Sequence, residues 1–406
     1  MANYNPIQNN MKNYKIFASI VDDATLKQVE EAASCEAYKD CEIRIMPDCH
    51  AGSGCTIGSV IRYKDRVVPN TVGVDIGCGM LVVELGNVDI DLKKLDEVVN
   101  KNVPSGFNIH DEITWEWDSF AYLNCRQSID KDYTFRSIGT LGGGNHFIEL
   151  DVDDSGDKYL VVHSGSRNLG VRVCSYWQEK AVTKLKNRSG IRNELIARLK
   201  AEGRAQDINK ELKKLVYPEV KKELAYVEDA DLFGYLNDMC LCQEYAEMNR
   251  KVIVDEILGE MGLDIVSFFQ SVHNYIDIKN HIIRKGAISA APHELLIIPM
   301  NMRDGSIIGK GKGNMDWLYS APHGAGRIMS RAQAFKEINI EDFKRSMDGI
   351  YSTSVCEGTL DEAPMVYKPA DIIRKDIEPT VEIVKVIKPL WNFKAKTSEN
   401  PLAPFN

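Results

Sequence analysis

Five of the eight histidines lie in short segments rich in Gly, Asn, Asp or Ser. These segments are Pro47–Gly52 around His50, Gly144–Phe147 around His146, His163–Arg167, His273–Tyr275 and Pro322–Arg327 around His323. Glycine beside a polar side chain lets the backbone approach a ligand closely, and turns at strand ends commonly carry binding and catalytic groups. One histidine in such a context is more often structural. Repetition of the context favours a shared site.

A carboxylate and a thiol, Asp75 and Cys78, lie three residues apart in the glycine-rich segment Gly73–Met80. A thiolate can bridge two cations, and with imidazole and carboxylate it makes a mixed ligand set that suits Mn, Fe, Co or Zn. Mg would prefer oxygen ligands alone. The alternative for Cys78 is a small buried thiol, the commoner fate of cysteine. Spacing alone leaves both interpretations open.

Two glycine-rich runs and three arginines bear on phosphate binding. Neither Gly139–Asn145 nor Gly309–Gly313 continues into the Gly-Lys-Ser/Thr of a Walker A loop, and the second run by itself predicts a β-turn. Arg167, Arg327 and Arg331 each follow one of the histidine segments or lie at its end. A guanidinium fork suits phosphate oxygens. Each arginine alone could form a surface ion pair, but beside metal ligands the three indicate a phosphate site.

Short β-branched runs broken by glycine predict a mixed sheet that positions these segments. The expected strands are Ile43–Ile45, Thr56–Arg62, Val67–Val68, Leu81–Glu84, Phe147–Leu150 and Tyr159–Val162, with more from Ile282 to about Gly313. A helix capped by Asp22–Asp23 and running to about Ala33 is expected, and another within Val88–Val103. The last ninety residues are expected to mix helices with loops.

From Val171 to about Met261 the chain is predicted to be helical and highly charged. Weak breaks are expected at Gly190, Gly203 and Pro218. Residues 191–222 hold nine Lys or Arg against five Asp or Glu. The commoner interpretation is a solvated helical face, and the alternative is an arm that contacts a nucleic-acid backbone. Because site-like segments occur on both sides, residues 176–262 are predicted to be a charged helical insertion within one catalytic domain, residues 1–406.

Composition narrows the class of protein. With 44% hydrophobic and 27% charged residues the chain is typical of a globular protein. The net charge of −9 argues against a broadly basic nucleic-acid binder but not against a local basic groove. The polar N-terminus and the absence of a long apolar run predict neither a signal peptide nor a membrane span, hence no membrane partner. Ten cysteines without a CxxC pair predict reduced thiols in a cytoplasmic protein.

Six ordered segments, together with Met46-Pro47-Asp48 before them and Lys394 after them, resemble the RtcB family of GTP-dependent RNA ligases. The six are Gly73–Gly79, Gly144–Glu149, His163–Arg167, His273–Tyr275, Arg284–Ala287 and His323–Arg327. Together they span nearly the whole chain and are far more specific than any one of them. The resemblance implies the single compact α/β (mixed α+β) fold of that family, unlike ligases built around a lysine nucleophile.

The resemblance also implies a role for each candidate residue. The implied ligands of two Mn²⁺ ions are Cys78, shared by both, with Asp75 and His146 on one ion and His163 and His273 on the other. His323 would be the nucleophile that takes GMP from GTP as a phosphoramidate. The implied nucleotide contacts are Asn145, His146, Phe147, Glu149, Asn274, Ser306, His323, Gly324, Ala325, Gly326, Tyr367 and Lys394. Arg167, Arg327 and Arg331 would hold RNA phosphates.

The implied reaction joins an RNA 3′-phosphate or 2′,3′-cyclic phosphate end to a 5′-hydroxyl end after GMP has capped the 3′-phosphate. The chain departs from the family at Pro299–Arg303, where many members read Pro-Gly-Ser-Met-Gly, and in the tail after Lys394. All implied metal and nucleophile positions are intact, which favours a divergent active member. The sequence leaves open whether the RNA comes from tRNA splicing or from RNA repair, and whether an activating protein takes part.

Two other functions would use the same residues. A two-metal phosphoesterase acting on RNA ends would form no covalent GMP and would not need His323. A nucleic-acid-binding subunit would hold structural metals, but such sites are normally closed and four-coordinate, whereas five ligands over two ions leave open positions. A GMP adduct excludes the first alternative, and metal-dependent turnover of RNA ends excludes the second.

Overall fold

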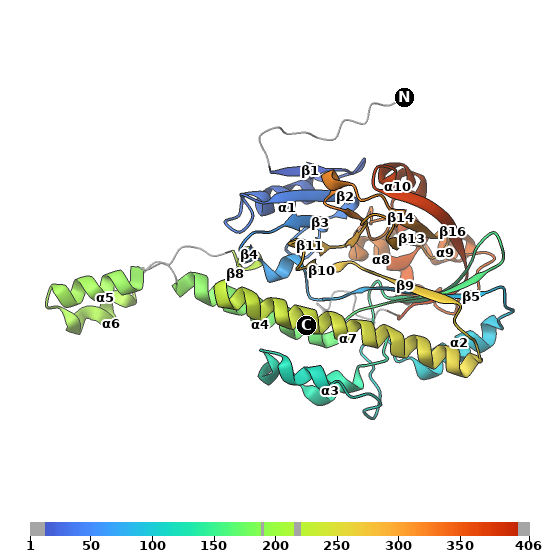
Figure 1. Cartoon of the computed structure of the whole chain (residues 1–406), viewed down its shortest axis with the longest axis horizontal. Coiled ribbons are helices and arrows are strands. Elements are labelled where there is room, and N and C mark those ends of the chain that lie inside the picture. Colours follow the sequence, from blue (N-terminus) through green and yellow to red (C-terminus); the bar gives the residue numbers. More distant parts are fainter. Residues whose placement is uncertain (1–12, 188–190, 215–220, 397–406) are drawn as a thin grey trace.

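The computed structural model describes residues 13–187, 191–214 and 221–396, which form helices around two main sheets (Figure 1). The α-helices are α1 (Asp23–Ser34), α2 (Leu92–Asn102), α3 (Lys131–Arg136), α4 (Arg167–Asn187), α5 (Ile191–Ala201), α6 (Ile208–Leu212), α7 (Asp229–Met261), α8 (Arg331–Glu337), α9 (Ile340–Ser346) and α10 (Ala370–Ile377). None of the helices in the described residues is both long and apolar enough to span a membrane. The mixed α/β class is confirmed.

The larger sheet has seven antiparallel strands. In spatial order they are β13 (Leu295–Asn301), β14 (Gly305–Gly311), β16 (Val381–Phe393), β6 (Phe147–Val152), β7 (Lys158–Ser164), β5 (Gly79–Gly86) and β9 (Ser267–Val272). Its edge strands β13 and β9 approach each other, and the backbone N–H of Ile297 donates to Ser271 Oγ at 3.1 Å. The sheet therefore curls until its two edges meet.

Both faces of strand β5 are buried, which explains why it is apolar almost throughout. On the outer face Leu81 and Val83 lie in one core cluster with residues of α2 and α7, such as Val99 and Ile257. The inner face carries a second cluster. It includes Met80, Val82, Phe147, Tyr159, Val161, Ile297, Ile308 and Ile387. Side chains on alternate positions of β6 thus point into an enclosed interior.

The smaller sheet has five strands. In spatial order they are β1 (Tyr14–Ile16), β2 (Glu42–His50), β3 (Ile57–Arg62), β11 (Ile282–Lys285) and β10 (Asn274–Asp277). Only β1 and β2 pair in parallel. Two short antiparallel pairs complete the described strands: β12 (Ala287–Ser289) with β15 (Ser320–Pro322), and β4 (Arg66–Val67) with β8 (Val227–Glu228).

The predicted strands and the first two predicted helices are confirmed, and Asp22 caps α1 by accepting from Thr25 N. Two predictions are wrong. The run Gly309–Gly313 is not a turn at its start, because Gly305–Gly311 form strand β14; a Cβ on Gly309 would lie 2.9 Å from Glu382 O, so glycine serves close strand packing there. The final ninety residues also contain the strand β16, whose pairing with β6 shifts register after Pro389.

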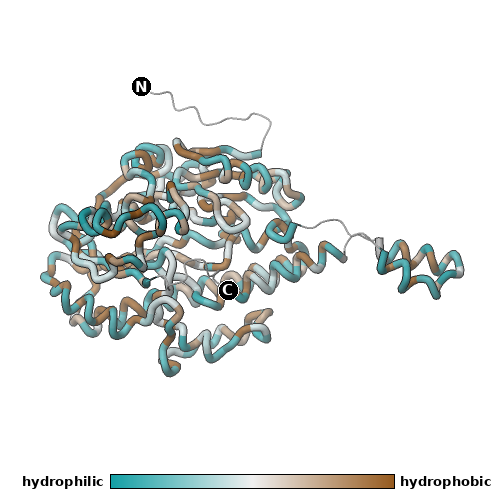
Figure 2. The backbone as a smooth tube through the Cα atoms, turned by 180° about the vertical axis from the view of Figure 1, so that it is seen from behind, coloured by the Kyte–Doolittle hydropathy of each residue, from teal (hydrophilic) through white to brown (hydrophobic). Residues whose placement is uncertain are grey.

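The predicted helical stretch has two parts in the structure. Helix α7 contributes to two core clusters, and α4 packs beside it. Helices α5 and α6 lie apart from the main body (Figure 1), with hydrophilic and hydrophobic residues intermingled along them (Figure 2). Gly203 follows α5 with a positive φ of 72°, whereas Gly190 and Pro218 lie outside the described residues. The boundaries of an insertion at 176–262 stay a prediction.

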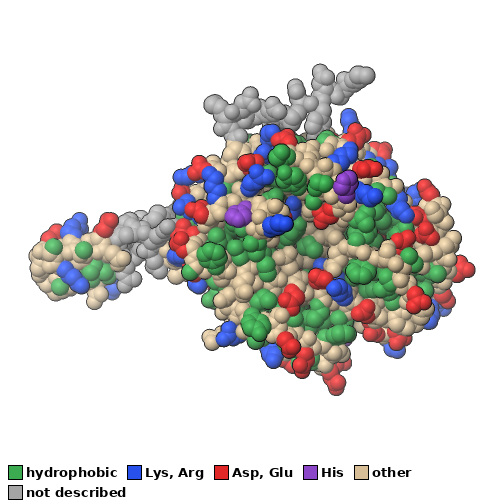
Figure 3. Space-filling model, in the orientation of Figure 1, with side chains coloured by type: hydrophobic (Ala, Val, Ile, Leu, Met, Phe, Trp, Pro, Cys, Tyr) green, Lys and Arg blue, Asp and Glu red, His purple; other side chains and the backbone are tan. Residues whose placement is uncertain are grey.

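Charged side chains of both signs are interspersed over the face drawn in Figure 3. On α5 and in the turn after it, arginines pair with nearby acids, as Arg198 and Arg204 do with Glu202. These acids are already counted in the predicted excess of positive charge for residues 191–222, so the excess remains, although Lys221 pairs with Glu31 outside the segment. Such exposed pairs contribute little to stability.

Candidate active site

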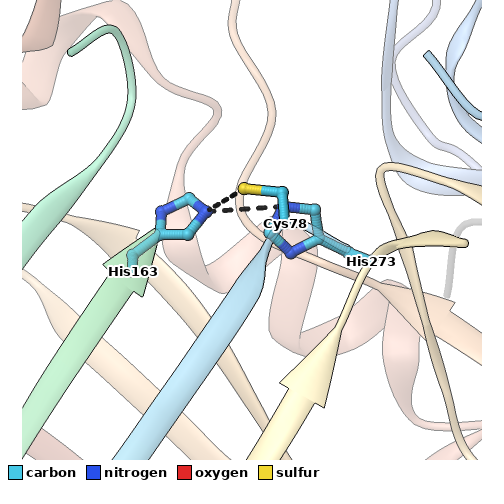
Figure 4. A group of neighbouring side chains, drawn as sticks. All are labelled: Cys78, His163 and His273. Atoms are coloured by element: carbon cyan, nitrogen blue, oxygen red, sulfur yellow. Dashed lines mark hydrogen bonds between the residues drawn. The ribbon is translucent and has the colours of Figure 1, made fainter. Parts of the chain in front are cut away.

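Topology brings the predicted metal ligands to one edge of the curled sheet. Because β5 runs antiparallel to β7 and β9, the start of β5 lies beside the ends of the other two strands. Cys78 precedes β5, His163 lies near the end of β7, and His273 follows β9. Figure 4 shows these three side chains pointing toward one another.

Two groups of ligand atoms form there, and Cys78 belongs to both. One group is Asp75, Cys78 and His146, and the other is Cys78, His163 and His273; within each group the atoms lie within 4.8 Å of one another. Cys78 Sγ lies 3.3 Å from Nε2 of His146 and 3.3 Å from Nε2 of His163. The structure thus brings all five predicted ligands together, with the thiol in the position of a bridging ligand.

Burial favours the uncharged forms of Cys78, His163 and His273. It raises the pKa of Cys78 well above its usual value, and the nearby Asp75 carboxylate adds to the shift. Burial, followed by neighbouring imidazoles, lowers the pKa of His163 and His273 well below the usual range. Neutral imidazoles offer lone pairs, and a divalent cation would displace the thiol proton. The donor set fits a divalent transition metal.

Contacts on both sides of the His146 ring and around the Asp75 carboxylate orient these two side chains. Asp75 Oδ2 lies 2.8 Å from His146 Nε2, and His146 Nδ1 lies 2.8 Å from Leu141 O, so the ring is held at both nitrogens. Although burial opposes it, His146 lowers the pKa of Asp75 to about 2. A Cβ on Gly165 would lie 2.1 Å from Asp75 Oδ1, so the carboxylate needs glycine at this position.

His323 lies against this cluster and is held by Asp48. Its Nδ1 lies 2.6 Å from Asp48 Oδ2, and its backbone N–H donates to the same oxygen at 3.1 Å. Asp48 is fully buried. When a carboxylate accepts from Nδ1–H, the proton stays on that nitrogen and Nε2 keeps a lone pair. The ring centroids of His323 and His273 are 4.7 Å apart.

Close packing around His323 depends on Gly286, which has a φ of 59°. A Cβ there would lie 3.2 Å from His323 Cε1 and 2.3 Å from Ile57 Cγ2. Strands β12 and β15 pair Ala287 with Pro322, which fixes the two segments side by side. Residues of the predicted Arg284–Ala287 motif therefore help to position the imidazole of His323.

A cavity of about 260 Å³ opens beside His323. The predicted site residues that line it are Asn145, Phe147, Glu149, His163, His323, Gly324, Ala325, Gly326, Arg327, Arg331, Tyr367 and Lys394. His50, Ile57 and residues 299–302 complete the wall, so the segment that departs from the family pattern faces the cavity. Burial lowers the pKa of His50 to about 4, which keeps its ring neutral.

Glu362 organises the cationic side of the cavity. This buried carboxylate accepts from Lys394 Nζ at 2.6 Å, from Tyr367 Oη at 2.7 Å and from Arg331 Nη1 at 2.9 Å. Burial opposes ionisation, yet Lys394, Arg331 and Arg327 lower the pKa of Glu362 to about 2. One carboxylate thus fixes several predicted contact residues in place.

Four residues predicted to contact nucleotide or RNA do not line the cavity: His146, which lies in the metal-ligand cluster, Asn274, Arg167 and Ser306. Asn274 Nδ2 donates to Asp75 O at 3.1 Å and its Oδ1 accepts from Gly286 N at 2.9 Å, so it links the metal turn to the His323 segment. Arg167 donates to Thr140 Oγ1 at 3.0 Å and to Gly106 O at 3.1 Å. Ser306 is buried on β14. Their contacts with nucleotide or RNA stay predictions.

Sequence reasoning missed three residues that position the site. Asp48 lies in the segment around His50, but its partner His323 is 275 residues away. Glu362 lies in a segment without a recognisable motif. Arg250 lies in the middle of α7, where a lone arginine is commonly solvated, yet it is only 1% exposed. The local sequence does not distinguish Arg250, because Glu247 and Lys251 beside it are also charged.

Arg250 and Asn249 tie α7 to the ligand-bearing turns. Arg250 Nη1 donates to Gly77 O at 2.8 Å and to Ser164 O at 2.9 Å. Asn249 Oδ1 accepts from Gly139 N at 2.8 Å, and its Nδ2 donates to Gly165 O at 3.2 Å. These bonds satisfy backbone groups on both sides of the metal cluster.

Replacing Arg250 with Met is expected to lower the free energy of unfolding by about 3 kcal/mol or more, because two buried carbonyls lose their partner. Chemical denaturation measures the change. The matched control is Lys251→Met on the same helix, whose ion pair with Glu247 is about half exposed. That change is expected to stay within about 0.5 kcal/mol. Equal small losses for both variants would contradict the role given to Arg250.

Comparisons with known proteins agree on one family. The family model described as tRNA-splicing ligase RtcB matches residues 28–123 and 118–395. The RNA-splicing ligase RtcB of Escherichia coli (strain K12) is 30% identical over 387 residues, which cover 85% of this chain and 88% of that protein. The tRNA-splicing ligases RtcB of Aeropyrum pernix and Nanoarchaeum equitans are 27% and 26% identical; the alignments cover 86% and 96% of this chain, and 86% and 93% of those proteins.

Proposed function

The chain belongs to the RtcB family and is an RNA ligase, and we propose that it joins an RNA 3′-phosphate or 2′,3′-cyclic phosphate end to a 5′-hydroxyl end through GMP carried on His323. The observation that carries the proposal is the bond from His323 Nδ1 to Asp48 at 2.6 Å, beside the metal-ligand cluster and the cavity. It supports a neutral imidazole whose Nε2 is free to attack phosphorus.

In the proposed first step His323 Nε2 forms a bond to the α-phosphorus of GTP, and the bond from that phosphorus to pyrophosphate breaks. The imidazole becomes positively charged, and the adjacent Asp48 carboxylate stabilises that charge. A 2′,3′-cyclic phosphate end is first opened by water to a 3′-phosphate. An oxygen of the RNA 3′-phosphate then forms a bond to the GMP phosphorus while the bond from that phosphorus to His323 Nε2 breaks, which turns a poor electrophile into one with a good leaving group. Attack by the 5′-hydroxyl releases GMP and closes the RNA backbone.

The five ligands support two Mn²⁺ ions, with Cys78 shared between the two groups. When bound, the ions would neutralise charge on the phosphate oxygens. The cavity residues supply the rest of the nucleotide contacts. Lys394 Nζ lies 5.2 Å from the centre of the Phe147 ring, and Glu149 offers acceptors for the N1 and N2 donors of guanine. Arg327 and Arg331 line the same cavity and are the nearest of the predicted RNA-phosphate residues.

Intact mass measured after incubation with GTP and Mn²⁺ tests the proposal. Wild type is expected to gain the mass of one GMP, in an acid-labile and alkali-stable bond, and His323→Ala to gain none. His293→Ala, which removes an exposed imidazole remote from the cavity lining, is expected to behave as wild type. Turnover of RNA ends by an unmodified wild type would instead favour a two-metal phosphoesterase.

A further inference from the structure

Two carboxyl groups lie two positions apart on β6, so Glu149 and Asp151 both face the interior of the curled sheet. Glu149 lines the cavity and is 5% exposed, and Asp151 is fully buried. Neither carboxylate oxygen of Asp151 has a hydrogen-bond partner with a fixed donor among the described residues. A buried polar group without a partner is costly, so these oxygens call for an explanation.

A proton shared between Asp151 and Glu149 would explain why the Asp151 oxygens have no other hydrogen-bond partner within the residues that the structure describes. The alternation of side chains along β6 places the two buried carboxyls two positions apart on the same face, and a hydrogen bond between them requires that one of them is protonated. Burial raises the pKa of both groups, and the neighbouring charge of Asp151 adds to the shift of Glu149. The pair therefore keeps at least one proton at neutral pH and takes up a second on acidification.

The charged and titratable groups that face this pair already have partners. Lys394, beyond the end of β16, binds Glu362 at 2.6 Å. Tyr159, opposite Asp151 on β7, donates its hydroxyl to Asp153 at 3.1 Å and accepts from Lys385 at 2.7 Å. In the described parts of the chain no cation forms an ion pair with Glu149 or Asp151. The proton is thus the counter-charge available to the two carboxyls.

We propose that Asp151 sets the base preference of the nucleotide cavity by taking up or releasing the proton that Glu149 shares with it. The proposal rests on the nucleotide site proposed above. An ionised Glu149 presents two acceptors, which match the adjacent N1–H and N2–H donors of guanine. A protonated Glu149 presents one donor and one acceptor, which match N1 and the N6 amino group of adenine. In the guanine-reading state Asp151 holds the proton and donates it to Glu149.

The affinity of the cavity for GTP is expected to depend on pH. Because the doubly protonated pair must release one proton before Glu149 can accept from guanine, affinity for GTP falls as the pH falls. One-proton linkage limits the change to about tenfold per pH unit. Affinity for ATP does not require that release, so the ratio of GTP to ATP affinity falls on acidification.

Two substitutions bias the pair toward opposite states. In Asp151→Asn the amide can donate to an ionised Glu149 and the neighbouring negative charge is gone, so the GTP to ATP ratio is expected to be higher than in the parent protein and to begin falling at a lower pH. In Glu149→Gln the amide keeps one donor and one acceptor at every pH, so the ratio is expected to be low and flat. Asp154→Asn removes an exposed carboxylate in the turn that follows β6 and serves as the matched control.

Isothermal titration with GTP and with ATP from pH 5.5 to 8.5, with Mn²⁺ and the full-length His323→Ala protein, measures binding without covalent transfer. Heats in buffers of different ionisation enthalpy are expected to show release of about one proton per GTP at acidic pH, and less at the same pH in Asp151→Asn. A flat ratio in the parent protein, or an unshifted pH dependence in Asp151→Asn, overturns the proposal. If the Asp151→Asn protein is unstable, the proposal is tested by the pH dependence of the GTP to ATP affinity ratio in the parent protein and by its absence in Glu149→Gln. Failure of wild type to form the GMP adduct would overturn the function proposed for His323 independently.

Discussion

Replacing Cys78 with Ala is expected to remove both metal ions at once and to slow RNA ligation by about 10³-fold or more, the rate equivalent of several kcal/mol of lost charge stabilisation. Cys78 Sγ belongs to both groups of ligand atoms, so its loss leaves each group with two ligands. Metal content after gel filtration and the rate of joining of a 3′-phosphate to a 5′-hydroxyl RNA measure the two effects.

The matched control is Cys174→Ala, which removes another buried thiol that belongs to neither ligand group. It is expected to keep both ions. His273→Ala leaves the group of Asp75, Cys78 and His146 complete and is expected to lose one ion. If Cys78→Ala still held two ions per chain, the thiol would not be the shared ligand.

The second large effect is expected from Asp48→Asn, which should slow guanylylation of His323 by about 10³- to 10⁴-fold. An amide can donate to Nδ1 and so stabilise the tautomer that carries its proton on Nε2, where the lone pair is needed. The Asp48→Asn substitution also removes the negative charge that would face the imidazolium of His323. The rate of adduct formation, followed by intact mass in quenched samples, measures the loss.

A merely structural role for Asp48 predicts a different result. Asp48→Asn is expected to keep its metal content and its affinity for GTP, and to lose only the rate of transfer. Asp376→Asn, which alters another buried carboxylate that accepts from Ser19, is the control for loss of a buried charge. Equal rates in the two variants would remove Asp48 from the proposed mechanism.

The grouping of the five candidate metal ligands could be predicted from the sequence because they all lie in short, recognisable motifs. Asp75 and Cys78 share one turn, and each histidine lies at a strand end that glycine or asparagine marks. Their convergence follows from an antiparallel sheet, in which starts and ends of neighbouring strands share an edge. Local signals were sufficient for this part of the site.

The residues that hold the nucleophile could not be predicted in the same way. The pairing of Asp48 with His323 depends on how two distant segments pack, and neither segment records it. Glu362 similarly acquires its role from Lys394, Tyr367 and Arg331, which reach it from two other segments. Strand β16 escaped prediction because charged residues interrupt its apolar pattern and a register shift follows Pro389.

Helix α7 is expected to restrict local opening of the segments that carry the candidate metal ligands. Loops that carry ligands commonly open on their own, at little cost in free energy. Here the segments that bear Cys78 and His163 are bonded through Arg250 to a helix whose buried apolar residues lie in two core clusters. Opening either segment would break these bonds, so its amide hydrogens are expected to exchange about as slowly as those of the buried part of α7.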